Sequence, residues 1–115
     1  MYKIQAKESE GDKELEDEMA KLLLYLQQGV VLGDYAEALH IPERKLSVFI
    51  NSTYGVSFKR WVNNKRVEYA TEQMAKHPDY TMERIAELSG FAHKSHFCKI
   101  FREITGGSFT EYKNR

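Results

Sequence analysis

Residues 85–106, IAELSGFAHKSHFCKIFREITG, decide the fold of this chain. The stretch opens with a short amphipathic run that breaks at Ser89-Gly90, and a second helical pattern follows the break. Gly90 can adopt the left-handed backbone conformation that ends one helix and redirects the chain. Phe91 is placed to fill the angle between the two helices. We therefore predict a helix-turn-helix.

The second helix of this pattern separates its residues into two faces. The apolar face carries Phe97, Ile100, Phe101 and Ile104. The other face carries Lys94, Ser95, Cys98, Lys99 and Arg102, and no acidic residue occurs between Phe91 and Arg102. Such a face suits a polyanion, and the second helix of a helix-turn-helix can enter the major groove of DNA.

Length and composition limit the class of protein. The chain has 115 residues, which fits one compact domain or two very small ones sharing a core, and 42% of them are hydrophobic, enough for a real core. Few alternating runs and only two prolines predict an all-α fold of about seven helices. The single cysteine excludes an internal disulfide and suits the reducing cytoplasm. No apolar run approaches ~20 residues, and no signal-peptide pattern opens the chain, so we expect no membrane segment here.

The charge is unevenly distributed although it sums to zero. Residues 1–20 hold three lysines and seven acidic residues, whereas residues 21–115 hold fourteen basic and ten acidic residues. From Arg44 to Arg66 there are six basic residues and no acidic one. A local basic face, rather than the net charge, forms the electrostatic footprint of a nucleic-acid-binding protein.

The N-terminal part lacks a helical period at first. Residues 1–12 are polar and contain a glycine, so we interpret them as a linker or disordered end, with the domain occupying residues 13–115. An apolar stripe then predicts a helix from about Lys13 to Gln28, stopped by Gly29.

The helix-turn-helix pattern occurs twice. In a first copy, at about residues 32–55, a short helix turns at His40-Ile41, and a second helix runs from about Glu43 to Ser52. The second copy occupies about residues 82–106. The corresponding positions are Ala36, Ile41, Leu46, Ile50 and Gly55 in the first copy, and Ala86, Phe91, Phe97, Phe101 and Gly106 in the second. An internal repeat is more informative than either copy alone.

A long helix is predicted between the copies, at about residues 57–76, ending before His77-Pro78. At ~1.5 Å per residue it is about 30 Å long, close to the ~34–36 Å between successive major-groove faces. This length favours two recognition helices in adjacent major grooves. Thr81 is a predicted N-cap, and Ser108 begins a capping box for a short final helix.

With both copies placed, the chain resembles the DNA-binding domain of the AraC/XylS family of bacterial transcription regulators. The resemblance runs from about Leu32 to Tyr112, and its most specific part is IAELSGFAHKSHFCKIFREITGGSFTEY. Arg66 and Ala70 match recurrent connector residues, while FIN at 49–51 and SF at 57–58 are similar to the branch found in hybrid or membrane-linked sensors. The resemblance implies double-stranded DNA and RNA polymerase as partners, and a sensing domain absent from this chain.

The sequence departs from that family pattern at four places. His40 stands where glycine is common, Ser108-Phe109 replaces the usual Thr-Pro, and Lys113 replaces an arginine. Val48 occupies a commonly basic position of the first recognition helix. That valine argues against strong base reading by the first copy.

The candidate contacts with DNA fall into two classes. Lysine, arginine and serine can donate to base edges, and those placed to do so, with one cysteine, are Arg44, Ser47, Lys94, Ser95, Cys98 and Lys99. Phosphate contacts, which position a protein without reading sequence, are expected from Lys45, Asn51, Lys59, Arg60, His96 and Arg102. Arg66 is expected instead to pair with an acid and brace the two halves.

Other chemistries are less well supported. His93, His96 and Cys98 lack a fourth ligand for structural zinc, so we predict no metal, no cofactor and no catalytic group. Trp61, Tyr69 and the phenylalanines are expected in the core. An alternative function is a protein-interaction module, in which the acidic first helix or the divergent first copy docks a partner. Substituting Lys94 and Lys99 by alanine separates the two hypotheses.

Overall fold

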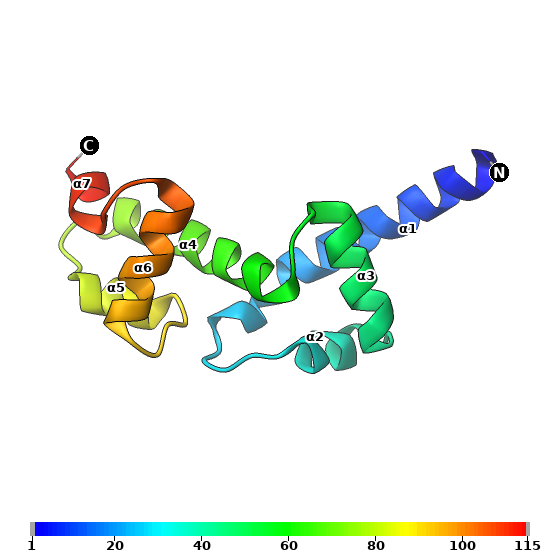
Figure 1. Cartoon of the computed structure of the whole chain (residues 1–115), viewed down its shortest axis with the longest axis horizontal. Helices are drawn as coiled ribbons and strands as arrows, with labels where there is room; N and C mark the ends of the chain where they lie inside the picture. Colours follow the sequence, from blue (N-terminus) through cyan, green and yellow to red (C-terminus); the bar gives the residue numbers. More distant parts are fainter. Residues whose placement is uncertain (1, 115) are drawn as a thin grey trace. The chain divides into compact units, whose positions relative to one another are not determined.

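The computed structural model describes the backbone of residues 2–114 and the side chains of residues 12–114. Within them lie seven α-helices, one 3-10 turn and no strand, which confirms the all-α prediction. The helices are α1 (Tyr2–Lys21), α2 (Leu32–Leu39), α3 (Glu43–Tyr54), α4 (Phe58–Lys76), α5 (Met82–Leu88), α6 (Lys94–Thr105) and α7 (Phe109–Lys113), and the turn is η1 (Leu23–Leu26) (Figure 1).

The chain divides into two compact units. The first unit comprises Met1–Leu24 and Val30–Phe58, and the second comprises Tyr25–Gly29 and Lys59–Arg115. Each unit contains one copy of the helix-turn-helix pattern, α2–α3 in the first and α5–α6 in the second. In the chain, α4 connects the two copies, as predicted from the pattern of residues 57–76.

The helix predicted from Lys13 to Gln28 is wrong at both ends, because α1 begins at Tyr2 and ends at Lys21. The expected linker at residues 1–12 therefore falls within α1 wherever the structure describes it. Lysine, glutamate, glutamine and alanine sustain a helix by propensity even without an apolar stripe. At the other end, α1 gives way to the 3-10 turn Leu23–Leu26, and the carbonyls of Tyr25 and Gln27 accept hydrogen bonds from Arg66.

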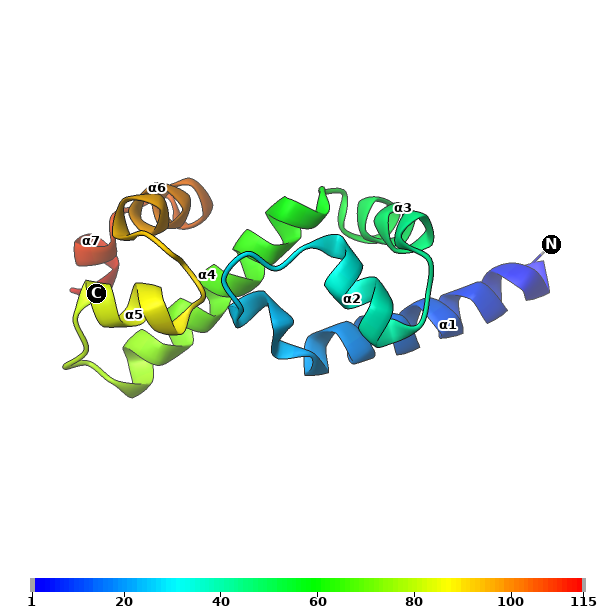
Figure 2. The same cartoon turned by 90° about the horizontal axis from the view of Figure 1, so that it is seen from below.

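In the first unit, α2 lies beside α1 and turns into α3 (Figure 2). The turn places His40 in the left-handed conformation, at φ 57°, as its position in the repeat requires. Tyr35 is fully buried, and its hydroxyl donates to the carbonyl of Leu22 at 3.1 Å. The buried apolar residues of this unit are Met19, Tyr35, Ala36, Leu46, Phe49 and Ile50.

In the second unit, α5, α6 and α7 share one hydrophobic core with part of α4. Its buried members are Val67, Ala70, Ile85, Ala86, Phe91, Phe97, Ile100, Phe101 and Phe109. Phe91 fills the angle between α5 and α6, where its ring packs edge-on against Phe97 at 5.2 Å. The caps predicted at Thr81 and Ser108 are both confirmed, because each hydroxyl accepts the backbone N–H three residues on.

The repeat extends to the details of the two second helices. Both α3 and α6 have 12 residues, and both end at a glycine in the left-handed conformation, Gly55 at φ 70° and Gly106 at φ 82°. In each case the glycine N–H donates to the carbonyl four residues earlier, at 2.9 Å. The same position in each helix therefore presents its side chain in the same way.

Candidate nucleic-acid interface

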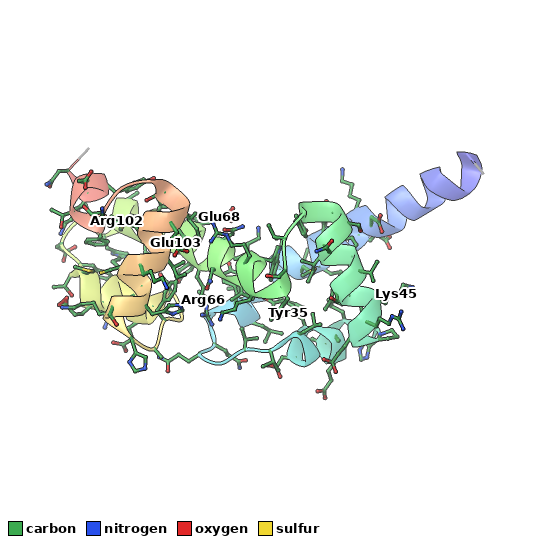
Figure 3. All side chains as sticks on the ribbon, in the orientation of Figure 1. Tyr35, Lys45, Arg66, Glu68, Arg102 and Glu103 are labelled. Carbon is green, nitrogen blue, oxygen red and sulfur yellow. The ribbon has the colours of Figure 1, made fainter. Side chains whose placement is uncertain are left out.

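The exposed face of α6 is basic and polar. Burial of Phe97, Ile100 and Phe101 fixes which side of this helix meets the core. The exposed residues that remain include five of the predicted contacts, Lys94, Ser95, His96, Lys99 and Arg102. Figure 3 labels Arg102 on this helix. The backbone thus brings most of the second copy's predicted site residues to one surface.

Cys98 differs from the other predicted base contacts. Its side chain is half-buried, and its Sγ lies 3.1 Å from the Sδ of Met82 on α5, at the edge of the second unit's core. A thiol placed in this way contributes to packing. Contact between Cys98 and a base remains only a prediction, and we leave it out of the proposed reading set.

Two of the predicted basic contacts form surface ion pairs. Arg60 Nη1 lies 3.5 Å from Glu103 Oε2, and Lys94 Nζ lies 3.6 Å from Glu83 Oε1. All four side chains are at least 40% exposed, and such pairs contribute only ~0–1 kcal/mol each. Both cations can therefore exchange a carboxylate for a phosphate at little cost.

His96 stands among positive charges. Partial burial lowers the pKa of its imidazole, and the nearby charges of Lys59, Arg66, Lys99 and His93 lower the pKa further. The ring packs edge-on against Phe91 at 5.7 Å. The charge of Lys59, on the first turn of α4, thus acts on the imidazole of His96 on α6.

On α3, the exposed residues include all four predicted contacts, Arg44, Lys45, Ser47 and Asn51. Burial of Leu46, Phe49 and Ile50 turns the opposite side of the helix outward. Val48 lies on this outward side with 61% of its surface exposed, the highest fraction among the large exposed hydrophobic residues described.

A groove of about 1000 Å³ opens between α1 and the α2–α3 pair of the first unit. One wall carries four acidic residues of α1, and the other wall includes Lys45, Val48 and Ser52 of α3. Lys45, labelled in Figure 3, thus borders the groove and the exposed side of α3 at once. Val48 lines this groove and also lies on the outward face of α3.

Arg66 is buried beneath the second helix-turn-helix. It is 8% exposed, its Nε donates to the carbonyl of Tyr25 at 2.6 Å, and its Nη2 donates to that of Gln27 at 2.9 Å (Figure 3). The guanidinium also lies 5.4 Å from the ring of Phe91. Arg66 therefore braces the second unit through main-chain carbonyls. Its pairing with an acid and its bracing of the two halves stay predictions.

Within the part of the chain that the structure describes, no group of three or more His, Cys, Asp or Glu side chains is arranged to hold a metal ion. Among those same residues, no helix combines the length and apolar character needed to cross a bilayer.

Comparison with known proteins identifies relatives of this fold. Residues 35–115 match the family model described as "Helix-turn-helix domain", which is of the AraC type. The regulatory protein PocR of Salmonella typhimurium is 31% identical over 101 residues, which cover 84% of this chain and 33% of that protein. The chain thus spans about a third of the length of this curated relative.

Two solved structures share the architecture. The C-terminal domain of AraT, a response regulator from Geobacillus stearothermophilus, has a TM-score of 0.75 and 24% identity over 90% of this chain and 83% of its own. The DNA-binding domain of AdpA, a global transcriptional factor solved in complex with a target DNA, has a TM-score of 0.72 and 22% identity over 87% and 89%. At these identities the likeness establishes the fold.

Sequence reasoning missed two features of this surface. It treated Val48 as a reason against base reading, although the exposure of this valine on the outward side of α3 is what makes a contact possible. It also missed the pairing of Arg60 with Glu103, which lies 43 residues further along the chain. Only the second feature needed the tertiary structure, because the helical period alone places Val48 opposite Leu46 and Ile50.

Proposed function

The chain belongs to the AraC-type helix-turn-helix family of DNA-binding transcriptional regulators, and from this premise we propose that it binds double-stranded DNA sequence-specifically through α3 and α6, in adjacent major grooves. The observation that carries the proposal is the match between the two helices. Each is a 12-residue helix with one buried apolar side, a left-handed glycine at its end and an exposed polar side. Each follows a short helix with the turn of a helix-turn-helix between.

Affinity and specificity come from different residues. Lysine and arginine neutralise phosphates and release counterions, and this is the role we assign to Lys59, Arg60 and Arg102. Lys45 is assigned the same role, whereas Asn51 and His96 are assigned hydrogen bonds to phosphate oxygens. Base reading is assigned to Lys94, Ser95 and Lys99 in α6, and to Arg44 and Ser47 in α3, where lysine and arginine can donate to guanine O6 and N7.

The wider biological setting is also a proposal. We place the protein in the cytoplasm, in contact with RNA polymerase, and governed by a sensing domain outside this chain. No catalytic activity is assigned, because its family is one of regulators and no site chemistry of the described residues calls for one.

A second candidate is an interaction module, and the groove in the first unit favours it. Four acidic residues of α1, Asp12, Glu14, Asp17 and Glu18, line the groove beside apolar side chains of α2 and α3. This combination complements a basic amphipathic segment of a partner protein. In that reading the first unit docks a protein and does not read bases.

Selection from a random pool of ~30-bp duplexes, with affinities measured by fluorescence anisotropy across salt, tests the main proposal. We expect a steep fall in affinity with salt and an enriched motif of two half-sites about ten base pairs apart. Lys94→Ala with Lys99→Ala should abolish one half-site. Lys59→Ala should weaken all sequences alike and reduce the salt slope by about 1.

Two results separate the candidates. Weak, salt-independent binding without enrichment contradicts DNA reading and favours the interaction module. An enriched motif that is unchanged when Lys94 and Lys99 are replaced contradicts the role of α6. Thr71→Ala, on α4, offers a neutral substitution for comparison, because its hydroxyl donates to the carbonyl of Glu68 within its own helix.

A further inference from the structure

We propose that Val48 is a specificity-determining residue that reads the methyl group of a thymine in the major groove. The inference rests on the proposed function and deepens it for the first unit. Val48 is 61% exposed on the outward side of α3, between the predicted contacts Ser47 and Asn51. A branched apolar side chain on an otherwise polar face has a natural partner in the one apolar group that the major groove displays, the thymine C5-methyl.

The internal repeat identifies the residue of α6 that corresponds to Val48 on α3. Val48 lies two residues after Leu46, two before Ile50 and seven before Gly55. In α6, Lys99 lies two residues after Phe97, two before Phe101 and seven before Gly106. Because α3 and α6 have the same length, the same buried side and the same C-terminal cap, Val48 and Lys99 hold equivalent places on their helices.

Val48 and Lys99 differ in chemistry although they occupy equivalent positions on their helices. Lys99 offers a charged donor that suits the acceptor atoms O6 and N7 of guanine, whereas Val48 offers no donor and suits a methyl group. The two half-sites should therefore differ at the equivalent base pair, with guanine under α6 and thymine under α3. This difference sets the orientation of the whole protein on its site.

Replacing single thymines by deoxyuridine tests the contact directly, because only the C5-methyl is lost. The half-site read by α3 is the one that survives Lys94→Ala with Lys99→Ala in the selection. Within it, we expect one thymine whose replacement weakens binding of the unmodified protein about fourfold, the effect of one buried methyl group. Val48→Ala should weaken binding to the thymine duplex by about the same factor and make the protein indifferent to the replacement.

Two further variants sharpen the test. Val31→Ala is the matched control, because Val31 is an equally exposed valine (58%) of the same unit that lies outside α3, and this variant should keep the full sensitivity to deoxyuridine. Val48→Lys places the chemistry of Lys99 on α3 and should change the selected base from thymine to guanine. Both replaced positions are exposed, so folding should persist, and circular dichroism checks this.

Some outcomes of these experiments would overturn the assignment of Val48 alone, and one would also overturn the proposed function. A half-site under α3 without thymine, no sensitive thymine, or a sensitivity that persists in Val48→Ala overturns the assignment while DNA reading stands. Enrichment of only the half-site that Lys94→Ala with Lys99→Ala abolishes also overturns the assignment, because α3 would then read no base. No enrichment at all overturns both the assignment and the proposed function.

Discussion

The Nε of Arg66 lies 2.6 Å from the carbonyl oxygen of Tyr25, 41 residues earlier in the chain. This buried hydrogen bond, with the one to Gln27, attaches the segment that follows α1 to the second unit. Gly90, in the turn before α6, lies against the carbonyls of Tyr25 and Leu26 and beside Arg66. The geometry of the second helix-turn-helix thus depends on a residue of the connector and on a segment far from both in sequence.

Replacing Arg66 should destabilise the fold strongly. Arg66→Ala leaves two carbonyls without their charged donor, so we expect a loss of about 2–5 kcal/mol in the free energy of unfolding, measured with urea. Arg66→Lys should fall between this variant and the unmodified protein, because lysine lacks the planar fork that reaches both oxygens. Lys65→Ala is the control and should lose less than about 1 kcal/mol, since its i,i+3 pair with Glu68 is partly exposed to solvent. Equal losses for the two alanine variants would contradict the bracing role.

Gly90 should tolerate a side chain far less well than Gly106. Both glycines have a positive φ, of 90° and 82°, which costs an alanine roughly 1–2 kcal/mol. A Cβ at Gly90 would also stand 2.8 Å from the Tyr25 carbonyl and 2.9 Å from that of Leu26, whereas a Cβ at Gly106 meets nothing within 4 Å. We expect thermal unfolding to show a loss of about 2–5 kcal/mol for Gly90→Ala and of about 1–2 kcal/mol for Gly106→Ala.

If Gly90 packs closely against the segment at Tyr25, the loss of unfolding free energy must be larger for Gly90→Ala than for Gly106→Ala. A loss of unfolding free energy that is smaller for Gly90→Ala than for Gly106→Ala would mean that the segment at Tyr25 moves to accommodate the added Cβ at little cost.

Removing the acid that faces Arg60 should strengthen binding to DNA of any sequence. Glu103→Gln frees the guanidinium from its 3.5 Å pair and removes one negative charge from the basic surface. We expect non-specific affinity at moderate salt to rise about two- to fivefold, the equivalent of up to ~1 kcal/mol. In a background of Arg60→Ala the gain should shrink, and an unchanged gain would show that Glu103 acts by general repulsion only.

The protonation of His96 should act on stability and on DNA binding in opposite directions. Its pKa is lowered in the folded chain, first by burial and then by the charges of Lys59, Arg66, Lys99 and His93. The unfolded chain therefore binds the proton more readily, so this group's contribution to stability is present above the ordinary pKa of 6.5 and is lost as the pH falls through the lowered value. Urea midpoints between pH 7.5 and 5 should fall less steeply in His96→Gln.

The pH dependence of DNA affinity should have the opposite sign to the pH dependence of stability. A phosphate near His96 favours the protonated imidazole, so affinity should rise on acidification, and more in the unmodified protein than in His96→Gln. Identical pH slopes of affinity for the two proteins would place His96 away from the phosphates.

Much of the architecture was predictable from the sequence because local rules govern it. The limits of α2, the caps at Thr81 and Ser108, and the glycines that end α3 and α6 follow from helical periodicity and from the backbone freedom of single residues. The limits of α1 did not follow, because no apolar stripe marks its beginning and the apolar stripe continues past its end into the 3-10 turn Leu23–Leu26.

The sequence by itself determined the fold class, the repeat and the side of each recognition helix that faces outward, because the spacing of apolar residues along a helix already separates its two sides. Only the tertiary structure decided the pairing of Arg60 with Glu103, the packing of Cys98 against Met82 and the carbonyl partners of Arg66. These contacts join residues 16 to 43 positions apart, and no local pattern encodes which distant side chains folding brings together.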